Sequence, residues 1–129
     1  MTKPTFVDDH AAITALLGQY IESGRQGRSA IMQSAFAADA TIFGVRNGQL
    51  ASTPVADFLA IVDQGGPSPA ARAAIASIDI AGTAASARVD TNDIAGFCFT
   101  DFFNLLKVKG QWLIVSKIYH AHQTPTPEA

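Results

Sequence analysis

The sequence predicts an α+β fold, in which N-terminal helices pack on a curved, mainly antiparallel sheet. Two observations lead to this prediction. Helical patterns dominate the first half of the chain, and four strand patterns follow one another in the second half, an order typical of α+β rolls. The last two strands, within residues 99–120, are apolar on both faces. A sheet with one face in water would alternate apolar and polar residues. We therefore expect helices on one face and a partner subunit on the other.

The first helix begins at Asp8 or Asp9, either of which can cap it, and ends at Gly24 and Gly27. Its apolar residues follow the i, i+3, i+4, i+7, i+8 spacing of one helix face: Ile13, Leu16, Leu17, Tyr20 and Ile21. A short second helix is predicted over residues 31–36. Its apolar stripe is small, with Ile31, Met32, Ala35 and Phe36, so we expect it to pack tightly on the first helix.

The next elements are a hairpin and a third helix. Residues 41–46 have a strand pattern, Asn47-Gly48 is a strong two-residue turn signal, and residues 49–52 form the return strand. Thr53-Pro54 then predicts a helix with threonine as its cap and proline at its first position. The apolar residues of this helix are Val55, Phe58, Leu59 and Val62, and the Gly-Gly-Pro run at 65–67 ends it.

Four strands complete the chain. Residues 74–80 and 84–91 are rich in alanine, but isoleucine, valine and threonine cluster around a central Gly82-Thr83, which favours a hairpin over a helix. A loop is predicted over 90–96. The two long strands of residues 99–120 follow, joined at a turn over Lys109-Gly110.

The composition sets limits on the function. The 129 residues fit a single domain spanning 1–129, with 124–129 as a frayed tail. A net charge of −2 without any Lys/Arg run argues against nucleic-acid binding. A single cysteine, Cys98, excludes an internal disulfide and a cysteine-based zinc site. No apolar run approaches the length of a membrane span, and the N-terminus lacks a signal-peptide core. We expect a cytoplasmic protein that needs no cofactor.

The order of elements, with Phe36-Ala-Ala-Asp-Ala-Thr41 after a tyrosine-bearing first helix, resembles the nuclear-transport-factor-like, or cystatin-like, superfamily of cone-shaped α+β folds. The ending from Phe99 to His120 resembles more narrowly its "putative lumazine-binding" branch. The resemblance covers nearly the whole chain. It implies a cone with a pocket at its open end and a homodimer formed through the sheet face. The superfamily includes ketosteroid isomerases, polyketide cyclases, dehydratases and binding modules, so the resemblance implies no single reaction.

The ketosteroid isomerases of this fold combine a tyrosine on the first helix, a protonated acid on a late strand and a carboxylate base on the first strand. Tyr20 matches the tyrosine, and Asp101 occupies a position resembling the protonated acid. The base would lie near Gly44, but residues 42–45 contain no acid. The resemblance therefore does not extend to that mechanism.

Asp101 has two possible roles. Flanked by phenylalanines, its charged form would be disfavoured by desolvation, and the neutral acid could donate a hydrogen bond to a ligand oxygen. Alternatively it is a buried acid paired with Lys117 on the next strand. A strict two-residue turn at 109–110 would put Ile118 and His120 on the face of Asp101, whereas a bulge would put Lys117 and Tyr119 there.

The aromatic residues suggest the kind of ligand. They predict a pocket for a small, planar, mostly apolar molecule, anchored by Tyr20 and Asp101. The candidate lining residues are Tyr20, Phe36, Phe43, Phe58, Phe99, Asp101, Phe103 and Tyr119. The alternative for most of the phenylalanines is plain core packing, and for Tyr20 a core position with its hydroxyl at the rim.

Two other functional classes remain open. One is an enzyme of the isomerase, cyclase or dehydratase type, with Asp101 as the acid and His120 as the base. The other is an interaction module whose sheet face binds another protein. His120-Ala-His122 has a spacing that can hold a metal, but the only other histidine, His10, lies on the first helix. No metal site is predicted.

Overall fold

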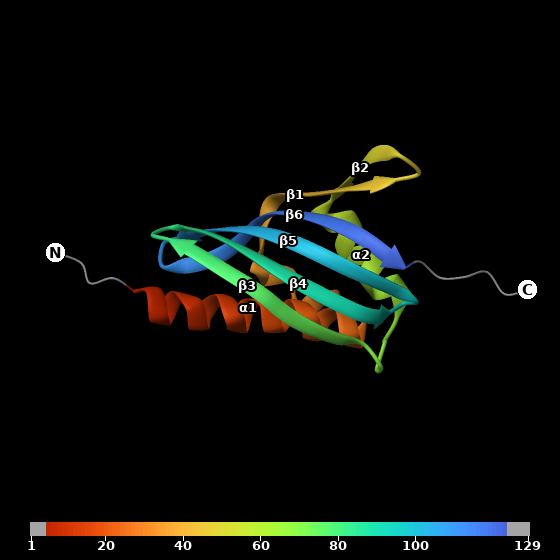
Figure 1. Cartoon of the computed structure of the whole chain (residues 1–129), viewed down its shortest axis with the longest axis horizontal. Coiled ribbons are helices and arrows are strands. Elements are labelled where there is room, and N and C mark those ends of the chain that lie inside the picture. The colour runs from red at the N-terminus through yellow and green to blue at the C-terminus, as the bar shows by residue number, and fades with distance from the viewer. Residues whose placement is uncertain (1–4, 124–129) are drawn as a thin grey trace, which may run out of the picture.

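A computed structural model describes residues 5–123 of the chain, and the predicted tail at 124–129 lies outside this range. The predicted α+β class is confirmed: a long helix and a shorter one accompany a six-stranded sheet (Figure 1). The elements are α1 (Phe6–Gln26), the 3-10 turns η1 (Ser29–Ile31) and η2 (Gln33–Ala35), β1 (Phe36–Arg46), β2 (Gln49–Pro54), α2 (Val55–Gly65), β3 (Arg72–Ala81), β4 (Ala84–Ile94), β5 (Phe97–Val108) and β6 (Gln111–Gln123).

The strands are ordered β2-β1-β6-β5-β4-β3 in one sheet. All neighbours are antiparallel except β1 and β6, which run parallel. β1 and β6 can run parallel because the chain from β2 to β5 separates them, and parallel neighbours need such a long connection. The sheet curves over α1, giving the cone that the element order predicted (Figure 1).

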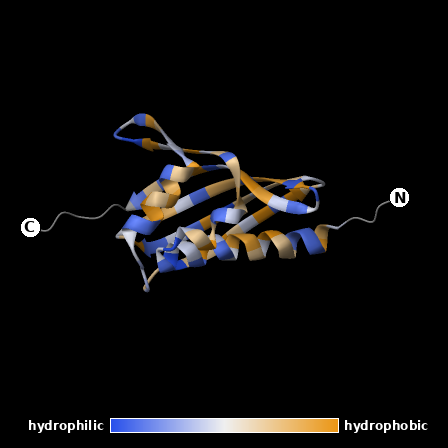
Figure 2. Ribbon diagram, turned by 180° about the vertical axis from the view of Figure 1, so that it is seen from behind, coloured by the Kyte–Doolittle hydropathy of each residue, from blue (hydrophilic) through white to orange (hydrophobic). Residues whose placement is uncertain are grey.

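The core lies between α1 and the concave face of the sheet. Hydrophobic and hydrophilic bands alternate along α1 (Figure 2), and its Ile13 and Leu17 are fully buried. They pack in one cluster with buried residues of η1 to β6, among them Met32, Phe36, Val89, Phe103, Leu105, Trp112 and Ile114. Each fully buried side chain of this kind contributes about 1.5–3 kcal/mol by leaving water. Within residues 5–123, neither helix combines the length and hydropathy that a membrane span needs.

The predicted turns are confirmed. Asn47 and Gly48 have φ of 51° and 75°, and Lys109 and Gly110 have φ of 51° and 79°. Positive φ at both central residues is the geometry of the tight hairpin turn whose twist matches that of the strands. The first helix ends where glycine predicted it, at Gly27, with a left-handed φ of 66°.

Three predicted boundaries are corrected. Residues 31–36 form no helix: two 3-10 turns fill 29–35, and Phe36 is already extended in β1, paired with Ile114. Pairing with β6 thus overrides the local helical pattern. The second α-helix begins after Pro54, which belongs to β2 together with Thr53, so threonine is not its cap. The predicted loop at 90–96 is mostly strand, because β4 pairs with β5 as far as Ile94.

The pairing of β5 with β6 decides which face Lys117 occupies. The turn at 109–110 is a strict two-residue turn, yet the register shifts farther along: Leu105 pairs with Ile114, whereas Asn104 pairs with Ser116. Val115 is therefore an extra residue in β6. A bulge of one residue moves every later side chain to the other face. Asp101 consequently pairs with Tyr119 and shares its face with Lys117.

Candidate functional site

A buried ammonium group lies inside the cone. The Nζ of Lys117 donates a hydrogen bond to the hydroxyl of Tyr20 at 2.9 Å and forms an ion pair with Oδ1 of Asp101 at 3.3 Å. The side chains of Lys117 and Asp101 are each only 5% exposed. Three elements thus meet at one point: α1 supplies the phenol, β5 the carboxylate and β6 the ammonium.

Aromatic rings surround this ammonium. Its Nζ lies 4.2 Å from the ring centroid of Phe58, 5.3 Å from that of Tyr20 and 5.6 Å from that of Tyr119. Ring faces carry negative charge density and attract a cation, more strongly where water is excluded. Tyr20 also packs edge-on against Phe103, at 4.9 Å between ring centroids, and against Phe36 at 6.3 Å. We call Lys117, Tyr20, Asp101, Phe58 and Tyr119 the lysine site.

The surroundings raise the pKa of both Lys117 and Tyr20. Burial alone would lower the pKa of Lys117, but Tyr20 and the Asp101 carboxylate outweigh it and the pKa is raised. Burial, followed by the charge of Asp101, raises the pKa of Tyr20 to about 12. The ammonium of Lys117 and the neutral phenol of Tyr20 therefore lie together beside Asp101. Of the two roles weighed for Asp101, the structure shows the pairing with Lys117.

The place expected for a catalytic base is closed. A Cβ atom at Gly44 would lie 2.4 Å from Cζ of Tyr119, much closer than any real contact. Gly44 pairs with Tyr119 across β1 and β6, so the missing side chain lets the tyrosine ring lie against the strand. An acid at position 44 would have to displace this ring.

The structure divides the other predicted lining residues between two faces. Phe99 packs edge-on against Tyr119 at 6.0 Å, on the inner face. Phe43 pairs with Ile118, and His120 pairs with Thr100, so both lie on the outer face. Their assignment to the site of Tyr20 and Asp101 is corrected, because strand neighbours alternate between faces.

Phe58 reaches the site from α2, a helix that is only partly buried. Within α2 no residue is buried, although Val55, Phe58, Leu59 and Val62 pack partly against the core cluster. The helix contacts β1, β2 and η1. Near its end, Asp63 accepts hydrogen bonds from the backbone N–H and hydroxyl of Ser29, at 2.7 and 2.8 Å. These bonds also lower the pKa of Asp63.

Two surface hollows of the structure lie away from the lysine site. One is lined by Arg72, Ala73, Ala74, Asp90 and Asn92, and another by residues 79–81 and 84–86, both along β3 and β4. Over Lys117 itself, the space is occupied by the ring of Phe58. A ligand at the lysine site must therefore displace a side chain.

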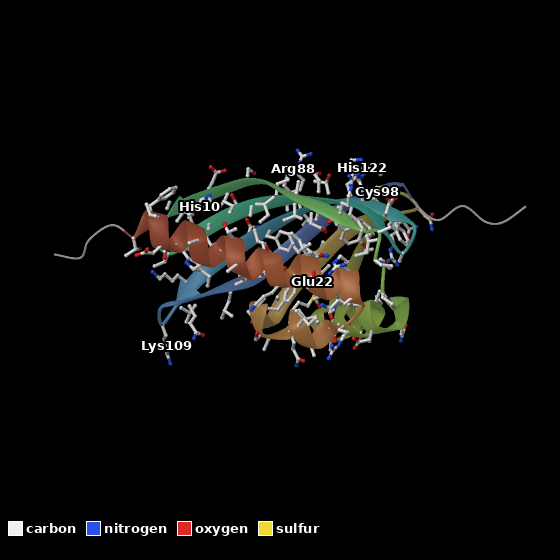
Figure 3. The ribbon with its side chains drawn as sticks, turned by 90° about the horizontal axis from the view of Figure 1, so that it is seen from below. His10, Glu22, Arg88, Cys98, Lys109 and His122 are labelled. Atoms are coloured by element: carbon white, nitrogen blue, oxygen red, sulfur yellow. The ribbon has the colours of Figure 1, made fainter. Side chains whose placement is uncertain are left out.

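The outer face carries a polar row. The hydroxyl of Thr100 bonds to Asp90 and to Nε2 of His122, the latter at 2.8 Å. The rings of His120 and His122 are 4.7 Å apart, and Arg88 lies beside Asp90; Arg88 and His122 project away from α1 (Figure 3). Within the described range, no group of three or more His, Cys, Asp or Glu side chains is arranged to hold a metal.

The structure has a second buried polar cluster, around Asp9, that the sequence did not predict. Oδ1 of Asp9 accepts hydrogen bonds from Nζ of Lys107 at 2.8 Å and from the indole N–H of Trp112 at 3.1 Å, and Thr5 donates to its other oxygen at 2.6 Å. These bonds, that of Lys107 above all, lower the pKa of Asp9. Asp9 therefore ties the first turn of α1 to the hairpin of β5 and β6 rather than capping the helix. An aspartate near the start of a helix does not indicate which residues far along the chain it will contact.

Comparison with known proteins identifies the family. The sequence profile of the family described as "putative lumazine-binding" matches residues 8–120. The chain belongs to this family. The resemblance of its ending to this branch, and of its fold to the nuclear-transport-factor-like superfamily, is thereby confirmed. The family description is itself tentative, and it assigns no reaction.

Solved structures agree with the fold. An NTF2-like protein of unknown function from Shewanella baltica OS155 is 52% identical, with a TM-score of 0.91 over 95% of this chain and 100% of that one. A second, from Methylobacillus flagellatus KT, is 40% identical, with a TM-score of 0.84 over 90% of this chain and 94% of that one. A curated relative, named aldolase FrzH, from Cladobotryum sp, is 29% identical over 95% of this chain and 98% of its own.

Proposed function

We propose that this protein binds a small, planar, mostly apolar molecule in the cone, next to the lysine site. The observation that carries the proposal is the buried ammonium of Lys117 surrounded by the rings of Tyr20, Phe58 and Tyr119. Flat rings offer contact area to a flat ligand, while few polar groups fix its orientation. The family description, which names lumazine, a planar bicyclic heterocycle, also supports a small planar ligand.

The energetics of the ion pair support a role beyond stability. Taking Lys117 and Asp101 out of water costs several kcal/mol per ion, and their attraction often does no more than offset this cost. A pair of apolar residues of similar volume would commonly be as stable. A buried pair beside the hydroxyl of Tyr20 is therefore better explained by ligand binding than by packing.

Binding is tested with lumazine and related bicyclic heterocycles. We expect at least one of them to raise the melting temperature of the protein and to bind measurably by calorimetry. Phe99→Ala, on the inner face of β5, should weaken this binding, whereas Phe6→Ala, exposed at the start of α1, should not. If no planar heterocycle shifts the melting temperature, the proposal fails.

An enzyme is the second candidate, favoured by the relative that is named an aldolase. An ammonium and a phenol side by side can stabilise charge that develops on a carbonyl oxygen. Asp101 is paired with Lys117, which argues against its role as a neutral acid, and His120 on the outer face cannot act with it in one cavity. The test is exchange of the α-protons of a simple ketone in D2O, followed by NMR. Equal exchange rates with the protein and with buffer would exclude this candidate.

We also propose that two copies associate through the outer face of the sheet. Phe102, Leu106 and Ile118 are 45%, 42% and 53% exposed there, which is unusual for large apolar residues on adjacent strands. The alternative is that this face binds a different protein. A cytoplasmic location stays a prediction.

A further inference from the structure

The ammonium of Lys117 has one donor direction that no oxygen fills. An ammonium carries three N–H donors. Within residues 5–123, its oxygen partners are the Tyr20 hydroxyl and the Asp101 carboxylate. Of the three rings around Nζ, that of Phe58 is the nearest, with its centroid 4.2 Å away. A ring face is a weaker partner for a cation than an oxygen acceptor is.

Phe58 belongs to the part of the wall that is easiest to move. It is half-buried, and no residue of its helix α2 is buried. The opposite wall is different: Phe103 on β5 is 1% exposed and Lys117 is 4% exposed. Segments with few buried apolar residues open at lower free energy than core strands do. The ring of Phe58 can therefore leave at a lower cost than any other group around Nζ.

We infer that the ligand presents a carbonyl oxygen to Lys117, in the position that the Phe58 ring occupies. This inference rests on the proposed function and names the ligand class: a planar ring ketone or ring amide. Lys117, rather than Tyr20 or Asp101, is the group that recognises the oxygen. The third N–H then gains a full hydrogen bond, and the displaced ring is replaced by the flat ligand.

Charge counting favours a neutral acceptor over an anion. Lys117 and Asp101 form a pair of zero net charge. A carboxylate or phosphate would bring a second negative charge close to Asp101, and like charges at short distance repel strongly where water is excluded. A carbonyl oxygen accepts the hydrogen bond without this cost.

Three matched probes test the inference: 1-indanone, indane and indane-1-carboxylate. We expect 1-indanone to bind roughly tenfold or more tightly than indane, the factor expected for a hydrogen bond from a charged donor. The carboxylate should bind more weakly than the ketone. The infrared carbonyl stretch of bound 1-indanone should move to lower frequency than in an apolar solvent.

Variants assign the effect to residues. Lys117→Met combined with Asp101→Asn, which avoids an unpaired buried charge, should abolish the preference for the ketone and the infrared shift. Tyr20→Phe should retain both. Phe58→Ala should bind 1-indanone at least as tightly as the unchanged protein, because the ring no longer has to be displaced. Phe6→Ala, at a 54% exposed phenylalanine at the start of α1, serves as the control.

The outcomes separate this inference from the proposed function. Equal affinity for indane and 1-indanone, or a preference that survives in the Lys117→Met, Asp101→Asn protein, overturns the inference and leaves planar-ligand binding intact. If the double variant does not fold, weaker ketone binding in Phe58→Ala still overturns it. If neither the unchanged protein nor Phe58→Ala binds any probe or heterocycle, both proposals fall.

Discussion

The buried pair of Lys117 and Asp101 determines how the stability of the protein responds to substitutions at these two positions. Both are buried, and each satisfies the other's charge at 3.3 Å. Removing one partner leaves a charge in a site that water cannot reach, whereas removing both leaves none. The pair is therefore sensitive to single substitutions even though its net contribution to folding is small.

We expect Asp101→Asn to lower the free energy of unfolding by about 3–5 kcal/mol, the usual cost of breaking a buried ion pair. Urea denaturation followed by circular dichroism measures it. Adding Lys117→Met should restore much of the loss. Had Asp101 been a neutral hydrogen-bond donor, asparagine would be tolerated, so an unchanged denaturation midpoint would contradict the ion pair.

Because of Tyr20, the stability of the protein should depend on pH in the alkaline range. The pKa of Tyr20 is raised to about 12, first by burial and then by Asp101, compared with about 10 in an unfolded chain. The folded state holds the phenol proton more tightly, so the stability is fully present below about pH 10 and falls as the pH rises toward 12. The slope should be on the order of 1 kcal/mol per pH unit, and the raised pKa of Lys117 acts in the same direction.

Urea unfolding at several pH values above about 9 measures this dependence. Tyr20→Phe should have a shallower loss of stability than the unchanged protein. The same slope in Tyr20→Phe and in the unchanged protein would show that the phenol proton is not held by folding.

Position 44 has room only for a glycine, which has a hydrogen atom in place of a side chain. A methyl group there would lie 2.4 Å from the Tyr119 ring, so we expect Gly44→Ala to destabilise the protein by about 1–3 kcal/mol through overpacking. Gly18→Ala is the matched control: nothing lies within 4 Å of the added atom, and alanine in a helix should stabilise by about 0.5–1 kcal/mol. Thermal denaturation compares the two, and equal melting temperatures would contradict the close approach.

At the scale of elements, the two helices differ in how they are held. α1 buries Ile13 and Leu17 completely and is tied to β5 and β6 through Asp9. α2 buries no residue, and its side-chain hydrogen bonds to η1 come from Asp63 near its C-terminal end. This asymmetry places the movable wall of the cone at α2.

Hydrogen exchange measures this difference. We expect the amides of α2 to exchange at least tenfold faster than those in the centre of α1, because opening α2 exposes little buried surface. A planar ligand that binds beside Phe58 should slow the exchange of α2 more than that of α1. Equal protection of both helices in the free protein would contradict the assignment of α2 as the movable wall.

At the scale of the whole molecule, the proposed dimer depends on the outer face of the sheet. Ile118→Asp, at a 53% exposed position in its centre, should convert a dimer to a monomer in analytical ultracentrifugation, because a carboxylate cannot be buried there unpaired. Val7→Asp on α1, 79% exposed and not part of the sheet, should leave the assembly unchanged. If the unchanged protein is already a monomer, the homodimer is wrong and a different partner becomes the better explanation.

Much of the fold followed from local patterns. The spacing of apolar residues predicted α1, and Asn-Gly and Lys-Gly predicted the hairpin turns, because these features act over a few residues. The family resemblance selected Tyr20 and Asp101, and the structure brings them together at Lys117. Residues 31–36 were mistaken for a helix because the pairing of Phe36 with β6 is a contact across most of the chain.

The sequence by itself determined the order of the elements, the turns and the chemical groups available to the cone. Only the tertiary structure decided which of these groups meet. One extra residue, Val115, turns Lys117 inward beside Asp101 and leaves His120 outside, and the register of β1 leaves Phe43 outside as well. Side chains in a strand alternate with a period of two, so a shift of one residue changes the face of every side chain beyond it. Such a shift depends on how two strands pair.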